Sequence, residues 1–140
     1  MATEVILQSA EREIAVLVAS GRVTVTRTRC VPGEQIAGPH VHRGHTDAFY
    51  VLEGELTFEI GRERRTITIH AGELVAAPPG VAHSFRTAGD VPARWLTIYA
   101  EDGGFAAFLR GMRDGVDVDW DISPVPPGGG LPAGEAAVTR

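Results

Sequence analysis

Two short segments about thirty residues apart carry three histidines and an aspartate, and together they constrain the fold more than any other feature. The first contains His40, His42 and Asp47, and the second contains His83. Side chains alternate across an extended strand, so the H-x-H pair places both imidazoles on one face. A metal ion needs more than two ligands, and Asp47 with His83 would complete a nitrogen and oxygen shell. The pattern therefore predicts one metal site built from strands distant in the sequence.

A simpler role exists for each of these residues. A single histidine on a half-buried surface is commonly only hydrogen-bonded, but three at matching spacing favour metal binding. His45, in the same loop, could be a substitute ligand or a proton-transfer group, because its unperturbed pKa is close to neutrality. We predict His45 as a catalytic residue, with a solvated loop histidine as the alternative.

The remaining pattern is one of short β segments punctuated by glycine and proline. Leu56, Phe58 and Ile60 alternate with polar residues, as expected for a strand with one buried face. Many short strands of this kind favour a sandwich or a barrel. The predicted strands are 13–19, 22–31, 47–52, 55–60, 65–71, 74–77, 83–87 and 94–100.

The spacing of the two segments resembles the two motifs of the cupin family. In the first, H-x-H is followed by four residues, Asp47, six residues and Gly54. In the second, Gly72 is followed by five residues, Pro78, Pro79, Gly80, two residues and His83. The resemblance implies an all-β fold, the cupin double-stranded β-helix or jelly-roll barrel, with one short C-terminal helix. It covers residues 22–100, after an N-terminal β segment at 1–21.

Three positions depart from the family pattern. Asp47 stands where the motif normally has Glu, Thr87 stands where it has Asn, and Gly33 is one residue further from the first histidine than usual. The side chain of Asp47 is one methylene shorter than that of Glu. We therefore expect Asp47 either to contact the metal directly from a closer backbone or to act through a water molecule.

Strand parity suggests which residues face the site. Phe85 and Thr87 share the parity of His83, and Phe49 shares that of Asp47, so all three are predicted to line the pocket. Ordinary core packing is the alternative for the two phenylalanines.

Composition narrows the class of protein. With 140 residues, 44% hydrophobic and 22% charged, the chain is expected to form one domain. A formal net charge of −5 argues against a nucleic-acid partner. Neither an apolar run of membrane-spanning length nor a secretory signal is evident, so a cytoplasmic location without membrane contact is expected. The single cysteine, Cys30, is predicted to be a buried structural thiol rather than a reactive one.

After residue 100 the pattern changes. Phe105, Phe108, Leu109 and Met112 follow helical spacing, with Asp102 placed to cap the start and Gly115 just past the end. We predict a helix within 101–115 packed on the barrel, with a lid or a dimer contact as alternatives for its apolar stripe. Residues 116–140 are rich in proline and glycine and are expected to be mobile or extended along a neighbour, without regular elements from residue 123 onward.

Two further segments, DAFYVLEGELTFEIG and GGFAAFLRGM, resemble small single-domain cupins related to quercetin dioxygenases. This resemblance implies one divalent transition metal (Fe, Mn, Ni, Zn, Co or Cu), a homodimer, and a metal-dependent oxygenase acting on a small phenolic or enol-type substrate. Two other functions stay open because fold alone does not fix chemistry. One is a non-redox metal-dependent isomerase, cyclase or lyase, and the other is a non-catalytic small-molecule-binding protein.

Overall fold

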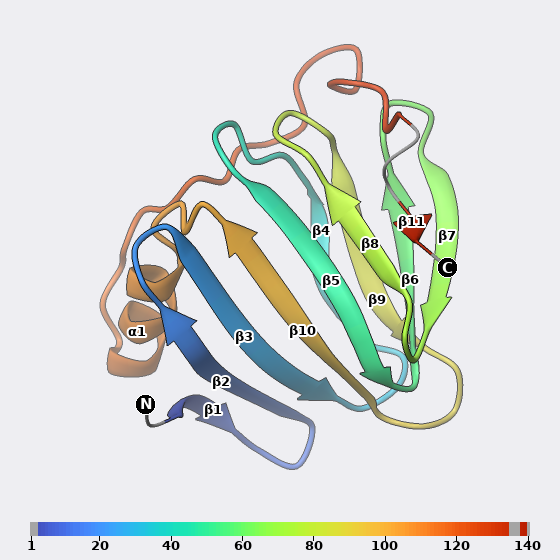
Figure 1. Cartoon of the computed structure of the whole chain (residues 1–140). Helices are drawn as coiled ribbons and strands as arrows, with labels where there is room; N and C mark the ends of the chain where they lie inside the picture. The colour runs from blue at the N-terminus through green and yellow to red at the C-terminus, as the bar shows by residue number, and fades with distance from the viewer. Residues whose placement is uncertain (1–2, 135–137, 140) are drawn as a thin grey trace.

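The computed structural model describes residues 3–134 and 138–139, and it consists of two antiparallel sheets that face each other (Figure 1). The seven-stranded sheet has the order β1-β2-β3-β10-β5-β8-β11, and the four-stranded sheet has the order β4-β9-β6-β7. The strands are β1 (Glu4–Gln8), β2 (Arg12–Ala19), β3 (Val23–Cys30), β4 (Gln35–His40), β5 (Thr46–Glu53), β6 (Glu55–Ile60), β7 (Arg65–His70), β8 (Leu74–Ala77), β9 (His83–Ala88), β10 (Ala93–Ala100) and β11 (Val138–Thr139).

The main core lies between the two sheets. Leu56, Phe58 and Ile60 of β6 are fully buried, as predicted, and Thr57 between them is also buried. Phe58 stacks on Phe85 of β9 with ring centroids 5.1 Å apart. Cys30 is also fully buried and unpaired, as predicted.

Strand β4 was not predicted, and it carries the first metal-site histidine. Its sequence contains Gly38 and Pro39, which normally argue against a strand interior. The strand is tolerated because it lies at the edge of its sheet and pairs only with β9. His40 ends this strand directly opposite His83.

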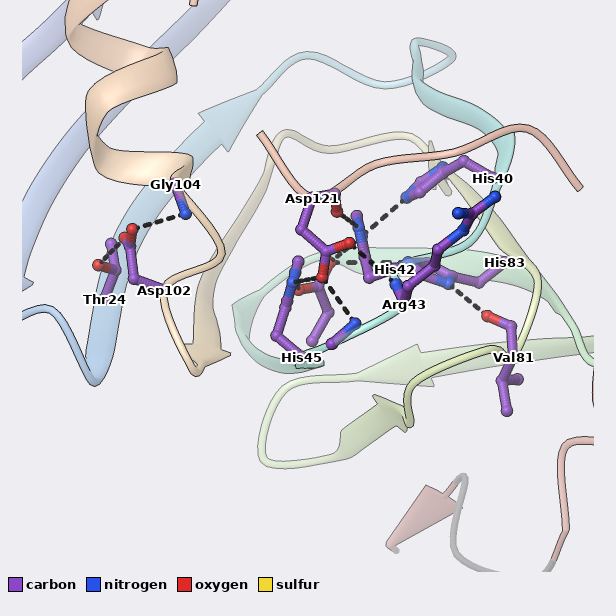
Figure 2. A network of polar contacts seen from close by, with 12 residues as sticks. Thr24, His40, His42, Arg43, His45, Val81, His83, Asp102, Gly104 and Asp121 are labelled. Carbon is purple, nitrogen blue, oxygen red and sulfur yellow. Dashed lines mark hydrogen bonds and ion pairs between the residues drawn. The ribbon is translucent and has the colours of Figure 1, made fainter. Parts of the chain in front are cut away.

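Helix α1 (Phe105–Asp114) begins and ends close to where the sequence predicts. The carboxylate of Asp102 accepts a hydrogen bond from the amide of Gly104, and the side chain of Thr24 also bonds to it (Figure 2). The amide of Ala106 donates a further hydrogen bond to the same carboxylate. Gly115 follows the last turn at φ 74°, a left-handed conformation that favours glycine. Leu109 packs against Ile6 and Val16, so the helix lies on β1 and β2. No helix in the described part of the chain has the length and apolarity needed to cross a membrane.

The segment that follows α1 runs along this same chain, across one end of the barrel (Figure 1). Ser123 exchanges both backbone hydrogen bonds with Val41, and Gly130 forms a bridge with Val81. The expectation that this region lacks regular elements is wrong at β11, which pairs with the free edge of β8. An unpaired strand edge offers backbone donors and acceptors that a short segment can satisfy.

Candidate metal centre

The structure brings the four predicted ligands together. One side-chain donor atom from each of His40, His42, Asp47 and His83 lies within 4.8 Å of the others, and all four residues are buried. His40 and His83 meet across the β4–β9 pair, and Asp47 projects from β5 in the other sheet. The centre therefore lies between the two sheets, where neither sheet alone could build it.

Each of the three imidazoles is fixed by a hydrogen bond from Nδ1 to a backbone carbonyl. A carbonyl oxygen only accepts, so Nδ1 carries the hydrogen and the lone pair of a neutral ring lies on Nε2. At metal sites, a hydrogen bond of this kind, from the ring nitrogen that does not bind the metal, orients the histidine ligand. The Nδ1 to oxygen distances are 2.7 Å from His40 to Gly38, 2.6 Å from His42 to Asp121, and 3.0 Å from His83 to Val81.

The Nε2 atoms then crowd around one carboxylate oxygen. His42 Nε2 lies 3.1 Å from His40 Nε2 and 2.9 Å from Asp47 Oδ2, and His83 Nε2 lies 3.6 Å from the same oxygen. Neither His83 Nε2 nor Asp47 Oδ1 has a hydrogen-bond partner in the described chain. Buried lone pairs that face one another repel unless a cation lies between them. The donor set therefore fits a divalent transition metal.

The ionisation of the ligands agrees with this arrangement. Burial, with the neighbouring His83, lowers the pKa of His40 to about 4, so its ring is neutral at physiological pH. Burial opposes ionisation of Asp47, but contacts with His42, His45 and His83 outweigh it and hold the pKa of the carboxyl well below its usual range. Neutral imidazoles and an ionised carboxylate are the forms that bind metal.

His45 is not a solvated loop residue. It is 1% exposed and stacks on His42 with ring centroids 4.2 Å apart. Its Nδ1 lies 2.8 Å from Asp121 Oδ2, and its Nε2 lies 2.9 Å from Asp47 Oδ1, in a geometry that forms no hydrogen bond. Burial lowers the pKa of His45, but the two carboxylates outweigh it and the net pKa is raised. His45 thus joins the metal cluster to the C-terminal segment.

Asp121 is a site residue that the sequence did not reveal. Its carboxylate accepts hydrogen bonds from the amides of Arg43 and Gly44 and from His45, and its carbonyl accepts one from His42 (Figure 2). Burial raises the pKa of this carboxyl, but the two amides and His45 outweigh that effect and lower it. One aspartate thereby fixes both the histidine loop and two imidazoles.

The metal cluster forms part of the wall of a cavity of about 570 Å³. His40 and Asp47 line this cavity together with Phe49 and Phe85, and these two phenylalanines also belong to the buried core between the sheets, which was the alternative role. Tyr99 also lines it, and burial with the nearby charge of Asp47 raises the pKa of its phenol well above the usual value. Further apolar side chains come from the helix and the segment after it, which sequence parity could not place: Phe105, Phe108, Leu109, Met112, Trp120 and Ile122.

Thr87 has a different role from the one predicted. It is fully buried, and its hydroxyl donates to the carbonyl of Val31 and accepts from the amide of Glu34, at 2.7 and 2.9 Å. It does not line the cavity that holds the cluster. The turn between β3 and β4 covers this end of β9, so Thr87 holds that turn instead of facing a ligand.

A model of the cupin domain matches residues 26–99, more than half of the chain. The chain belongs to the cupin family. The match contains all four residues of the metal cluster and His45, while Asp121 lies outside it. In this cupin, a residue from the segment after the matched domain therefore contacts the cluster.

Solved structures with similar folds agree with this assignment. An uncharacterized conserved protein with a double-stranded β-helix domain from Klebsiella pneumoniae is 25% identical, with 68% of this chain and 81% of that chain covered and a TM-score of 0.58. TT1209 from Thermus thermophilus is 26% identical, with 67% and 87% covered and a TM-score of 0.59. A predicted oxalate decarboxylase from Thermotoga maritima, 24% identical over 64% of this cupin and 80% of that chain, has a TM-score of 0.58 and supports the fold alone.

Proposed function

We propose that this cupin binds one divalent transition metal through His40, His42, Asp47 and His83 and is a metal-dependent oxygenase. Its substrate would be a small phenolic or enol-type molecule. The observation that carries this proposal is the convergence of fixed Nε2 lone pairs and a buried carboxylate on one point at the wall of a largely apolar cavity. Such an ion supplies Lewis acidity and, when redox-active, electrons for reaction with dioxygen.

The surrounding side chains suit an unsaturated organic molecule. The cavity volume lies within the range of about 300–1,000 Å³ typical of small-molecule sites. Phe49, Phe85 and Phe105 offer aromatic surfaces to a planar substrate, and they exclude water from the cluster. Burial raises the pKa of Tyr99 above its usual value, so its phenol stays protonated well beyond physiological pH.

A second function, a non-redox metal-dependent isomerase, cyclase or lyase, is favoured by the position of His45. This buried imidazole contacts Asp47 on one side and Asp121 on the other, so it can hold a proton next to the cluster. In that case the ion acts only as a Lewis acid, and His45 moves the proton.

Oxygen consumption separates the two functions. Protein loaded in turn with iron, manganese, nickel, cobalt, copper or zinc is assayed with an oxygen electrode on a panel of flavonols and diketones. Oxygen uptake that depends on substrate and is lost in His83→Ala supports the oxygenase. Absence of oxygen uptake with every metal contradicts it, and turnover of the same panel under nitrogen with zinc then supports the second function.

A further inference from the structure

One of the described residues that line the cavity at the metal cluster, Arg12, carries a positive charge at physiological pH. Arg12 of β2 lines it together with Ile14, two residues further along the same strand. Residues two apart on a strand share a face, so this arginine lies on the side of β2 that faces α1 and the cavity. Glu13, between them, is on the other face and pairs with Arg29.

Arg12 is half-buried yet its guanidinium lacks a partner, whereas the other arginines of the described chain without a side-chain partner are exposed. Among residues 3–134 and 138–139, its guanidinium has no ion pair, no hydrogen bond and no ring contact. A half-buried guanidinium beside apolar walls gains strongly from an anion, because the local dielectric is low and a carboxylate accepts two parallel hydrogen bonds. Five other arginines are instead paired with carboxylates: Arg29, Arg64, Arg94, Arg110 and Arg113.

The sheet register gives the separation between Arg12 and the metal cluster. Arg12 lies opposite Cys30 on β3, whereas Tyr99 pairs with Thr24 on one side and with Asp47 on the other. Cys30 and Thr24 are six positions apart on β3, so Arg12 and Asp47 are separated by about 20 Å along the strand direction. Arg12 and the cluster residues His40 and Asp47 line the same cavity across this separation, so a ligand touching both must be elongated.

The space between these two ends is aromatic. Phe85, Tyr99 and Phe105 line the cavity together with Arg12, and Tyr99 stacks on Phe105 with ring centroids 4.0 Å apart. From these observations we propose that the ligand of this cavity is an elongated aromatic acid. Its anionic group binds Arg12, its rings lie on the aromatic walls, and its other end reaches the metal cluster. This assignment of the substrate class rests on the proposed function of the same cavity.

Calorimetric titration with two matched probes tests the proposal. The acid probe is a hydroxybiphenyl carboxylate with its two polar groups at opposite ends, and the neutral probe is the corresponding carboxamide. Both are titrated into zinc-loaded protein, which cannot react with oxygen through a redox change of the metal. We expect the wild-type protein to prefer the acid, and Arg12→Gln to weaken acid binding about tenfold or more while changing amide binding less than about twofold.

Two further variants separate the role of Arg12 from a general effect of charge or of folding. Arg12→Lys keeps the charge but loses the bidentate geometry, so its acid affinity should fall between those of the wild type and Arg12→Gln. Arg27→Gln removes an exposed arginine of the neighbouring strand β3, and it should bind both probes as the wild type does. Equal weakening of acid and amide in Arg12→Gln, or no binding of either probe to the wild type, overturns the proposal.

The same titrations, repeated with protein whose metal has been removed by a chelator, show whether Arg12 or the metal recognises the carboxylate. If Arg12 is responsible, the preference for acid over amide persists without metal; if the preference disappears on chelation, the metal binds the carboxylate and the proposal is wrong. Failure of the proposed function is visible separately in the oxygen-electrode assay, which does not depend on the acid preference.

Discussion

The backbone oxygen of Asp121 accepts a hydrogen bond from Nδ1 of His42 at 2.6 Å, across 79 positions of the sequence. Its carboxylate contacts His45 and two amides of the histidine loop. The C-terminal segment is therefore part of the metal centre, because it fixes which nitrogen of His42 faces the cluster. The barrel supplies all four candidate ligands, and this segment orients one of them, His42.

Asp121→Ala tests the contribution of the carboxylate. The variant loses the contacts with His45 and with the amides of Arg43 and Gly44, while the backbone bond to His42 can remain. Loss of a group that orients metal ligands typically weakens metal affinity by about 10–100-fold. Competition with a chelator measures this change, and the exposed Asp117→Ala is the matched control. Equal metal affinities in the two variants would contradict the role of Asp121.

Gly103 lies close enough to His45 that a larger residue should displace the imidazole. A Cβ at Gly103 would clash with Nδ1 of His45, whereas a Cβ at Gly21 meets nothing within 4 Å. Both glycines have positive φ, at 64° and 87°, so Ala carries backbone strain of about 1–2 kcal/mol at either position. Gly103→Ala should lower the free energy of unfolding by a further 1–3 kcal/mol, as overpacking does. Chemical denaturation of both variants measures the difference, and equal losses would show that the clash is relieved.

The barrel core should be sensitive to truncation. Leu56 is fully buried between the sheets, and Leu56→Ala should lower the free energy of unfolding by about 2–5 kcal/mol because it leaves a cavity. Leu131 is 53% exposed, and Leu131→Ala should cost about 0.5 kcal/mol or less. Urea denaturation of the two variants gives both values. A cost below about 1 kcal/mol at Leu56 would contradict the described packing.

The ion pairs between Glu4 and α1 should make a pH-dependent contribution to stability. The hydrogen bond from Arg110 lowers the pKa of Glu4, against a smaller opposing effect of burial. A carboxyl with a lowered pKa stabilises the fold above its unfolded pKa, and this stabilisation is lost as pH falls through the folded pKa. Glu4→Gln should therefore be less stable than the wild type by about 0.5–1 kcal/mol at pH 7.

The comparison of Glu4→Gln with the wild type at low pH checks the sign of this effect. The difference in the free energy of unfolding should shrink toward zero as the pH falls below the ordinary carboxyl range and the Glu4 carboxyl of the wild type becomes protonated. Added salt should also reduce the difference at pH 7, since both partners are partly exposed. A constant difference across this pH range would indicate that Glu4 acts through packing.

The four clustered residues could be predicted because their signal is local. The H-x-H spacing predicts that His40 and His42 face one point, although His42 lies just past the end of β4, and Asp47 and His83 stand at fixed spacings within two short motifs. The same reasoning placed Phe49 and Phe85 on the cavity wall. It failed at Thr87, because parity gives the face of a strand but not which loop covers it.

The partners of the cluster could not be predicted, because their positions depend on chain folding over long distances. Asp121 lies in a segment with no motif, and only the path of the chain after α1 brings it to His42. Arg12 and Tyr99 reach the cavity through the register of β2, β3 and β10, which the alternation of a single strand does not specify. Strand β4 was not predicted because it contains Gly38 and Pro39, which are unfavourable inside a strand and are tolerated at the edge of a sheet.

The metal content of the protein tests the central claim most directly. Elemental analysis of protein purified without added metal, before and after reconstitution, is compared for the wild type, His83→Ala and His70→Ala. His70 is exposed and contacts Glu55 and Glu73, so its loss removes a histidine without touching the cluster. We expect about one ion per chain in the wild type and in His70→Ala, and loss of the ion in His83→Ala. A wild-type protein that binds no divalent transition metal, or a His83→Ala variant that retains it fully, would contradict the account.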